Sequence, residues 1–305
     1  MEQPRRVLVS GSSGLIGSAL VPALRDQRFR VIRLVRNRAA ADDSVLWNPD
    51  AGQLDASGLE GLDAVVHLAA ENIAAHRWTG KEKLRILNSR AQGTRLLCEK
   101  MAALPVPPRV IVSASAMGYY GERGDDPLTE NEPPGRGFLC DVVRAWEDAT
   151  RPASESGIRV VMLRLSIVLS SAGGTLGKLL PLFRMGLGGP LAGGQQYFSW
   201  ITIQDVIGTV LHSIATPDLS GPVNVSSPNP VRQTEFARIL GRVLSRPAVF
   251  NVPRVALRLR LGKELADSVL WSDRIVPEKL LRSGYRFLYP DLEAGLRTLL
   301  GKPAS

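Results

Sequence analysis

The chain has 305 residues, and its composition already excludes several classes of protein. Hydrophobic residues make up 44% of the chain and charged residues 22%, values typical of a globular protein rather than a disordered or fibrous one. The sequence has no apolar stretch near the roughly 20 residues that a membrane helix needs, and no secretion signal. We therefore expect a cytoplasmic protein without a membrane partner. Its two cysteines and three histidines are scattered, which predicts neither a disulfide framework nor a metal site.

The net charge is +9, and the basic excess is concentrated between Arg232 and Lys302. A solvated basic surface and a nucleic-acid surface both fit this excess. The sequence has no basic stripe interleaved with aromatic residues, and no helix-turn-helix or zinc-finger pattern. We therefore expect no nucleic-acid partner.

Strand-like and helix-like segments alternate through about residue 170. Short runs rich in valine and isoleucine predict buried strands, which fall at residues 6–10, 30–36, 63–68, 109–115 and 159–168. The segments between them predict three helices. The first ends near residue 27, and the other two span residues 80–104 and 138–156. This alternation indicates an α/β fold, with a doubly wound parallel Rossmann sheet that carries helices on both faces.

The pattern changes after residue 170. The glycine-rich stretch 171–194 predicts an irregular connection over a cleft, and residues 234–244 and 253–261 predict helices. Val223–Val225 fits one more strand, and Asp205 is expected to be a helix N-cap. We therefore expect a Rossmann domain at residues 1–170, with its sheet completed by part of 197–230. Residues 171–305 should form mainly a smaller, mostly helical lobe on the substrate side.

A glycine turn ends the first predicted strand and opens the following helix. Its residues are Gly11, Ser12, Ser13, Gly14, Leu15, Ile16 and Gly17. Gly14 would let the backbone approach a pyrophosphate, and Gly17 would let the helix pack closely on the sheet. The first turn of that helix would offer free N–H groups and a positive dipole to phosphates. The alternative is an ordinary glycine turn, because the spacing is G-x-x-G-x-x-G rather than G-x-G-x-x-G.

The end of the second predicted strand indicates which dinucleotide the turn would hold. Proteins that bind NAD place an acidic residue there, against the ribose 2′-hydroxyl. Here the strand ends in Arg36, Arg38 follows, and no acidic residue occurs before Asp42. A guanidinium can pair bidentately with a 2′-phosphate, so the sequence predicts NADP(H), with Arg36 on that phosphate. A solvated surface arginine is the alternative, and it fits Arg38 better than Arg36.

Several motifs together resemble the extended and atypical short-chain dehydrogenase/reductase superfamily. They are the three glycines, the Val-Val-His-Leu-Ala-Ala segment at residues 65–70, and the Ser-Ala-Ser-Ala-Met-Gly-Tyr-Tyr-Gly segment at 113–121. Further pieces resemble its "epimerase family protein" group, also labelled nucleoside-diphosphate-sugar epimerase or cell-division inhibitor. These pieces lie at residues 77–79, 88–90, 146–147, 173–176 and 198–201. The resemblance implies an NADP-binding Rossmann domain and a smaller C-terminal lobe, without naming a substrate.

The resemblance also implies roles for individual residues, each with a structural alternative. His67, Leu68, Ala69 and Ala70 would pass along the cofactor, although His67 also fits a histidine satisfied within a strand. Arg90 lies near the place of an active-site asparagine, and it would face an anionic ligand or solvent.

The resemblance also implies roles for two serines at the end of the strand predicted at residues 109–115. Ser113 would lie beside the cofactor, and Ser115 would lie next to the nicotinamide and a substrate carbonyl. There the Ser115 hydroxyl would donate to an oxygen that gains negative charge. The alternative for Ser115 is a buried hydroxyl bonded to the backbone.

The chain departs from the superfamily at its acid/base pair. No Tyr-x-x-x-Lys occurs, and the expected positions fall at or near Leu139 and at Val143, neither of which can exchange a proton. Tyr119 and Tyr120 follow the serine-rich segment and are possible substitutes. Arg144 could hold a ribose or a phosphate but could not act as a base. Each of these residues also fits a packing or surface role.

Two functional hypotheses fit these residues. The first is an NADP(H)-dependent oxidoreductase or epimerase-like enzyme on an unidentified small molecule, with Ser115 and Tyr120 as candidate catalytic residues. The second is a non-catalytic NADP(H)-binding redox sensor or regulatory protein that acts through a protein partner. Loss of the tyrosine and the lysine favours the second hypothesis, whereas Ser115 at a strand end favours the first.

Overall fold

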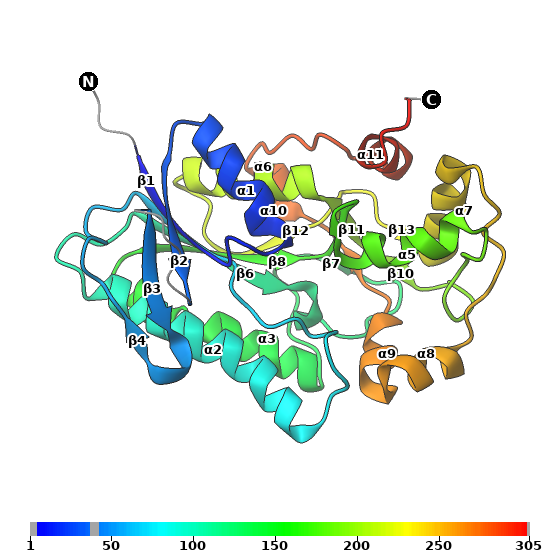
Figure 1. The fold of residues 1–305 in the computed structure, drawn as a ribbon, viewed down its shortest axis with the longest axis horizontal. Helices are drawn as coiled ribbons and strands as arrows, with labels where there is room; N and C mark the ends of the chain where they lie inside the picture. The colour runs from blue at the N-terminus through cyan, green and yellow to red at the C-terminus, as the bar shows by residue number, and fades with distance from the viewer. Residues whose placement is uncertain (1–4, 37–42, 304–305) are drawn as a thin grey trace.

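A computed structural model describes residues 5–36 and 43–303 (Figure 1). The central sheet has eight strands: β1 (Arg6–Ser10), β2 (Arg30–Val35), β3 (Ser44–Asn48), β4 (Gln53–Leu54), β5 (Ala64–His67), β6 (Val110–Ala116), β8 (Arg159–Leu165) and β12 (Gly221–Val225). Their order across the sheet is β12-β8-β6-β5-β1-β2-β3-β4. Neighbouring strands pair in parallel, except that β4 runs antiparallel to β3. This order confirms the predicted Rossmann fold.

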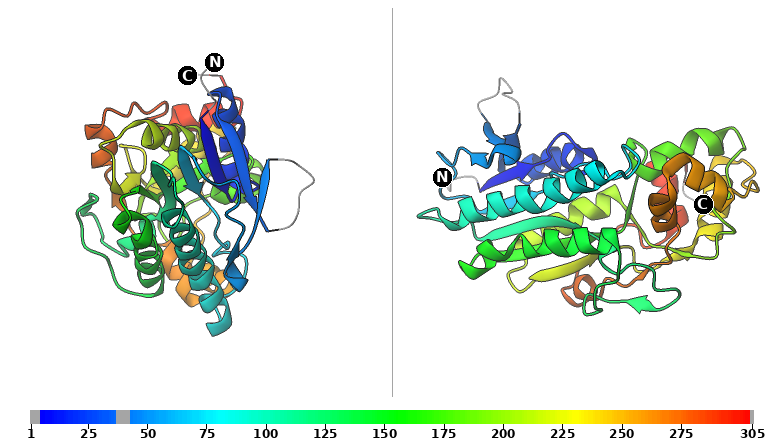
Figure 2. Two further views of the ribbon diagram at one scale, coloured as in Figure 1. Left: turned by 90° about the vertical axis from the view of Figure 1, so that its left-hand side faces the viewer. Right: turned by 90° about the horizontal axis from the view of Figure 1, so that it is seen from below.

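Helices cover both faces of the sheet (Figures 1 and 2). One face carries α1 (Leu15–Asp26) and α6 (Ile203–Ala215), which lie above the sheet in Figure 1. The opposite face carries α2 (Gly80–Ala102), α3 (Phe138–Asp148) and α4 (Arg151–Glu155). The sheet is therefore buried from both sides, as its continuous apolar strands predict.

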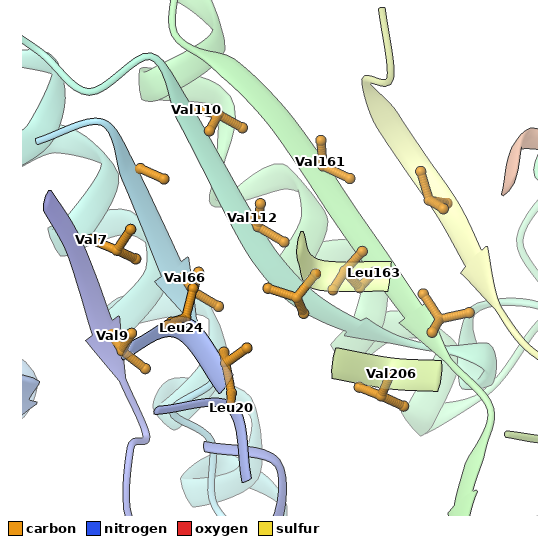
Figure 3. Packing of buried hydrophobic residues seen from close by; sticks show 14 of the residues in the cluster. Val7, Val9, Leu20, Leu24, Val66, Val110, Val112, Val161, Leu163 and Val206 are labelled. Carbon is orange, nitrogen blue, oxygen red and sulfur yellow. The ribbon is translucent and has the colours of Figure 1, made fainter. Parts of the chain in front are cut away.

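Strand periodicity divides the side chains of the sheet between two hydrophobic clusters. Val7 and Val9 of β1 pack in the cluster that contains Leu20 and Leu24 of α1 (Figure 3). Leu8, between the two valines, belongs instead to the cluster on the α2 face. Successive strand residues point to opposite faces, so a single apolar strand can contribute to both clusters.

A smaller lobe lies at the carboxyl ends of the strands, to the right in Figure 1. Its helices are α5 (Gly174–Arg184), α7 (Gln233–Leu244), α8 (Arg254–Leu261), α9 (Lys263–Val269) and α11 (Leu292–Leu299). The remaining short elements are β7 (Pro127–Leu128), β9 (Ile167–Ser170), β10 (Tyr197–Phe198), β11 (Trp200–Thr202), β13 (Val231–Arg232), β14 (Arg274–Ile275), α10 (Glu278–Arg282), η1 (Pro49–Ala51) and η2 (Met117–Tyr119). Trp200 is fully buried in the core of this lobe, and its indole N–H donates to the carbonyl of Asn229.

The structure corrects several predicted elements. The helix predicted at residues 138–156 is divided into α3, which ends at Asp148, and α4, which begins at Arg151 with Pro152 in its first turn, where proline is well tolerated. The glycine-rich stretch 171–194 contains α5, with glycine before and at its start. Asp205 is not the N-cap of α6, because the Thr202 side chain accepts the Asp205 N–H in that role. Strands β3 and β4 were not predicted, and Arg38 and Asp42 lie outside the described residues.

None of the helices within residues 5–36 and 43–303 combines the length and the apolar character needed to cross a membrane.

Candidate functional site

A cleft of about 970 Å³ opens at the carboxyl ends of β1, β2 and β5. Strand β1 is flanked by β2 on one side and by β5 on the other, so the strand order reverses here, and open α/β sheets bind ligands at such a point. The wall is formed by the glycine turn at residues 11–14, the β2 end at 33–36, the segment 68–71 after β5, and one face of α2. Of the predicted cofactor residues, the wall therefore contains Gly11 to Gly14, Arg36, and Leu68 to Ala70.

The glycine turn has a shape that side chains would prevent. Gly11 has φ +66°, and a Cβ there would lie 2.7 Å from the carbonyl carbon of Leu68. A Cβ on Gly17 would lie 2.2 Å from the Gly11 oxygen, so Gly17 is needed for closure of the turn itself rather than for packing on the sheet. The turn is closed by a hydrogen bond of 3.0 Å from Gly14 N–H to the same oxygen. Because Gly11 and Gly17 carry no side chains, the turn can close on itself and its backbone can line the cleft.

The first turn of α1 leaves its backbone N–H groups available to a ligand. Gly14 is the N-cap, no described side chain caps the helix, and its first turn has no acidic residue. Uncapped N–H groups and the helix dipole together favour an anion at this position. The side chains of Leu15 and Ile16 do not line the cleft; Leu15 instead lies against Gly174, which begins α5 of the smaller lobe.

The cleft has an excess of positive charge. Among the described residues that line it are four cationic side chains and two carboxylates, namely Arg33, Arg36, Lys81, Arg85, Asp50 and Glu71. Arg36 is 65% exposed, and Arg33 has a buried Nε atom without a hydrogen-bond partner in the described part of the chain. Cationic side chains beside an open helix N-terminus favour an anionic ligand.

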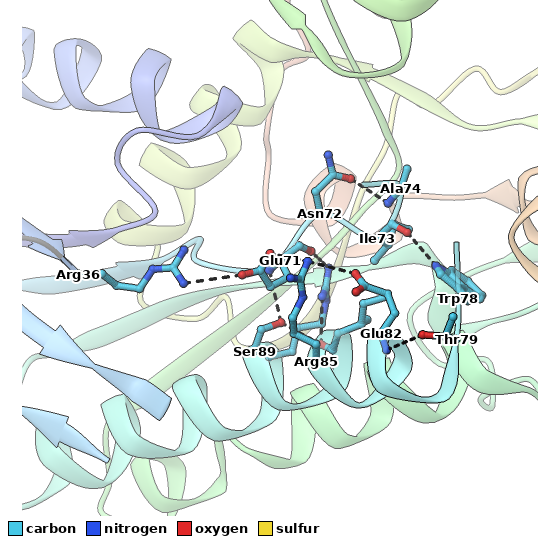
Figure 4. Close-up of polar contacts among 12 residues, drawn as sticks. Arg36, Glu71, Asn72, Ile73, Ala74, Trp78, Thr79, Glu82, Arg85 and Ser89 are labelled. Carbon is cyan, nitrogen blue, oxygen red and sulfur yellow. Dashed lines mark hydrogen bonds and ion pairs between the residues drawn. The ribbon is translucent and has the colours of Figure 1, made fainter. Parts of the chain in front are cut away.

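One carboxylate lies between two of these arginines (Figure 4). Glu71 follows β5, and its two oxygens lie 3.7 Å from Arg36 and 3.6 Å from Arg85. Arg85 also pairs with Glu82 on α2, at 3.2 Å. Glu71 therefore connects the end of β2 to α2 through ion pairs across the cleft. The sequence analysis did not single out this residue.

His67 lies beneath the cleft instead of in its wall, and it is fully buried. The Ser10 hydroxyl accepts the backbone N–H groups of Leu68 and Ala69, at 3.1 and 3.2 Å. Its single proton is therefore available to His67 Nδ1, at 2.7 Å, so Nε2 carries the ring proton and donates to Thr94, at 3.0 Å. Burial lowers the pKa of His67 to about 4, so the ring is neutral. His67 thus fixes the Ser10 hydroxyl, which in turn accepts the N–H groups of the segment after β5.

Arg90 is also not brought to the cleft wall. It is buried, and its guanidinium donates to the carbonyl groups of Ile86 and Glu71. It also lies over the ring of Trp146, 5.0 Å from the centroid. Burial lowers the pKa of Arg90 to about 10, a change that nearby Glu71 opposes. Arg90 therefore anchors the backbone of Glu71 and is not free to meet a ligand.

The serine-rich strand end is buried as well. Ser113 on β6 donates to the carbonyl of Ala114, and it does not reach the cleft. Ser115 is 2% exposed, and its hydroxyl donates to the Glu147 carboxylate of α3, at 2.6 Å. A carboxylate only accepts hydrogen bonds, so the Ser115 proton is directed away from any substrate oxygen.

Ser115 belongs to a polar row that crosses three neighbouring strands. Ser115 of β6, Arg164 of β8 and Asn224 of β12 lie side by side in register. Arg164 pairs bidentately with Glu147, at 2.8 Å for each bond. The Tyr120 hydroxyl donates to Asn224 and accepts from Arg164, and burial raises the pKa of Tyr120 to about 12. Tyr120 is fully buried, so this arrangement uses both predicted catalytic hydroxyls for internal bonds.

These observations can now be compared with known proteins. A profile described as "NAD dependent epimerase/dehydratase family" matches residues 7–226, which include the whole sheet and the cleft. The chain belongs to the NAD dependent epimerase/dehydratase family. A second profile, "Domain of unknown function (DUF1731)", matches residues 252–299.

Relatives in this family match almost the whole chain. "Epimerase family protein Mb2239" of Mycobacterium bovis is 43% identical over 92% of this chain and 93% of its own length. The crystal structure of human epimerase family protein SDR39U1 with NADPH has a TM-score of 0.90 at 32% identity, and it covers 97% of this chain and 99% of that one. A nucleoside-diphosphate sugar epimerase from Corynebacterium glutamicum has a TM-score of 0.81 at 34% identity, covering 98% of this chain and 59% of that one. The predicted family resemblance is thereby confirmed.

Within this family fold, apolar residues occupy the positions expected for the acid/base pair. A Cβ on Gly118 of η2 would lie 3.7 Å from Leu139 and 3.8 Å from Val143, both on α3. Helix α3 therefore presents an aliphatic surface to the segment after β6. Arg144, one residue further, is exposed and pairs with Asp141.

Sequence reasoning missed part of the cleft wall. Lys81, Arg85, Asn88 and Gln92 recur at helical spacing on α2, so a polar face was detectable from the sequence. Nothing in that spacing indicates that the face meets the glycine turn.

Proposed function

We propose that this chain binds NADP(H) in the cleft between the glycine turn and α2. The observation that carries the proposal is the open N-terminus of α1 in the same cleft as Arg33, which forms no ion pair with the described residues, and the exposed Arg36. Backbone N–H groups of the turn would hold the pyrophosphate, the two arginines the 2′-phosphate, and the segment 68–70 the adenosine. The NADPH in the structure of the human relative supports the same cofactor class.

The cleft fits such a ligand in size and in charge. Its volume of about 970 Å³ lies within the range usual for ligand pockets, roughly 300 to 1,000 Å³. Two of its cations pair with Glu71, whereas Arg33 forms no ion pair within the described residues. A cofactor with several phosphates would neutralise this charge.

The first candidate for the activity of the cofactor-bound protein is that of an NADP(H)-dependent oxidoreductase or epimerase-like enzyme on a small molecule. When bound, the nicotinamide supplies or accepts a hydride. Family membership supports this candidate. The hydroxyls of Ser115 and Tyr120 are bonded to Glu147 and Asn224, so a different group would have to carry the proton.

The second candidate is an NADP(H)-binding redox sensor that acts through a protein partner. A specific observation favours it: Leu139 and Val143, at or near the positions where the resemblance to the superfamily puts its acid/base pair, form an aliphatic surface. A protein that only binds the cofactor has no need for a proton donor there. The two candidates share the cofactor site and differ in turnover.

Calorimetric titration with NADPH and NADH tests the shared part. Arg36→Ala should weaken NADPH binding by about ten- to a hundredfold and NADH binding little, since a charge-assisted hydrogen bond contributes about 1.5–3 kcal/mol. Gly14→Val should weaken binding of both nucleotides, because its side chain would block approach of the pyrophosphate to the turn. Arg151→Ala, at an exposed arginine of α4, is the matched control. Equal loss of both nucleotides in Arg36→Ala would refute the 2′-phosphate assignment.

Turnover separates the two candidates. The pure protein is incubated with a dialysable metabolite extract, and NADPH oxidation and NADP reduction are followed by absorbance at the nicotinamide band. Protein-dependent turnover supports the enzyme, and its persistence in Ser115→Ala would assign the proton to another group. NADPH binding without turnover in either direction supports the sensor.

A further inference from the structure

Glu71 places a negative charge where the cofactor assignment requires a phosphate. Its carboxylate lies 3.7 Å from Arg36 and 3.6 Å from Arg85, and all three residues line the cleft (Figure 4). The sequence predicts NADP(H) because no acidic residue follows β2 closely. The fold supplies that acidic residue from the end of β5 instead.

We propose that Glu71 sets the discrimination between NADP(H) and NAD(H) by pairing with the arginines that a 2′-phosphate would otherwise engage. This inference rests on the proposed cofactor site. Glu71 acts here as a specificity-determining residue, and it weakens the preference for the phosphorylated cofactor.

The direction of the effect is set by charge. A phosphate monoester carries about −1.5 to −2 charges at pH 7, so a 2′-phosphate at Arg36 would be repelled by the nearby carboxylate. It would also have to displace an existing ion pair of that arginine. A ribose 2′-hydroxyl brings no charge, and it can donate a hydrogen bond to a carboxylate. Glu71 therefore penalises NADP(H) and leaves NAD(H) unchanged or favours it.

The backbone of Glu71 is fixed, so the carboxylate cannot move far from the cleft. Its carbonyl accepts from the buried Arg90, at 2.9 Å, and its N–H donates to Ser89, at 3.4 Å. Its side chain is 28% exposed, and its second oxygen already lies beside Arg85. When a phosphate takes Arg36, the Glu71 side chain can turn toward Arg85, but the negative charge remains in the cleft wall.

The arginines differ in their dependence on Glu71. Arg85 has a second carboxylate partner, Glu82, at 3.2 Å, whereas Glu71 is the only described carboxylate that pairs with Arg36. Removal of the Glu71 charge should therefore release Arg36 most of all. The phosphate site would then gain a free guanidinium and lose a repulsive neighbour.

The test compares two probes that differ only in the 2′-phosphate: adenosine 2′,5′-bisphosphate and adenosine 5′-monophosphate. Calorimetric titration of Glu71→Gln should show the bisphosphate bound about three- to tenfold more tightly than in the unchanged protein, as expected for a partly screened charge at short range. Binding of the monophosphate should stay the same or weaken. Glu99→Gln is the matched control, because it removes an exposed carboxylate from the far end of α2.

A double variant identifies the route of the effect. If Glu71 acts through Arg36, the gain from Glu71→Gln should shrink in the Arg36→Ala background. Unchanged or weaker binding of the bisphosphate in Glu71→Gln, or an equal gain in Glu99→Gln, would overturn the inference and leave the cofactor site intact. Failure of the unchanged protein to bind either probe or NADPH would overturn the proposed function, and the inference with it.

Discussion

The buried ion pair between Arg164 and Glu147 gives a prediction about stability. The side chains are 3% and 11% exposed, and two hydrogen bonds of 2.8 Å join them. Burial opposes the charge of Arg164, but the hydrogen bonds that Arg164 donates to Glu147 and its contacts with Tyr120 outweigh burial and raise the arginine pKa. The guanidinium therefore remains charged at any ordinary pH. Glu147→Ala would leave that charge buried without an anion.

The expected cost can be derived from the contacts that are lost. Removal of one partner from a buried ion pair destabilises a protein by about 3–5 kcal/mol, because the remaining charge stays unsolvated. Ser115 also loses the acceptor of its hydroxyl, which adds roughly 1 kcal/mol. We expect a total near the top of the range of about 3–5 kcal/mol. Glu147→Gln should cost less, since its amide oxygen can still accept a bond from Arg164.

Urea unfolding followed by far-ultraviolet circular dichroism measures this difference. Glu155→Ala, at an exposed position of α4, removes a carboxylate from the surface and should change the free energy of unfolding by no more than about 0.5 kcal/mol. A Glu147→Ala protein within about 1 kcal/mol of this control would show that water reaches Arg164, and it would refute the reasoning from burial.

Two further predictions concern the region beneath the cleft. His67 has a pKa of about 4 when folded and 6.5 in the unfolded chain, so only the unfolded chain gains a proton between these values, and stability should fall as the pH falls through that window. The loss of stability should approach about 3 kcal/mol, and it should be absent in His67→Gln. Urea midpoints measured from pH 7 to 4 give the comparison, with His76→Gln as an exposed control. Parallel stability curves for the unchanged protein and His67→Gln would contradict the prediction. Gly17→Ala puts a methyl group 2.2 Å from the Gly11 oxygen, so it should weaken NADPH binding and cost about 1–3 kcal/mol of stability. Calorimetry and urea unfolding of Gly17→Ala measure both effects, and unchanged affinity would show that the turn can adjust.

The sheet and the glycine turn could be predicted because their signals are local. Apolar runs such as Val7–Val9 identify a strand from its own residues, and Gly11, Gly14 and Gly17 mark the turn by spacing alone. The charge in the cleft was only partly predictable. Arg36 was found by its place after β2, whereas Glu71 enters from another strand, 35 positions later in the chain. A local pattern cannot report which segments meet across a cleft.

The roles of the Ser115 and Tyr120 hydroxyl groups could not be predicted either, because their partners are distant in the chain. A strand-end position suggests that Ser115 could face a ligand, but its actual partner, Glu147, lies 32 residues away. Tyr120 is bonded to Asn224, 104 residues away and two strands across the sheet. Whether a hydroxyl faces a ligand or a buried carboxylate is decided by tertiary packing, which sequence spacing does not encode.

The return of the chain to the sheet after it has built part of the smaller lobe restricts how the protein can be divided. Strand β12 pairs along β8, and α6 covers one face of the sheet through its buried Val206 and Val210. A fragment ended near residue 170 would expose the hydrogen-bonding edge of β8 and strip α6 from its apolar neighbours, which would favour aggregation. A shortened form that keeps this core must also extend past α10, because Leu280 packs in the same cluster and Tyr285 and Phe287 pack against it.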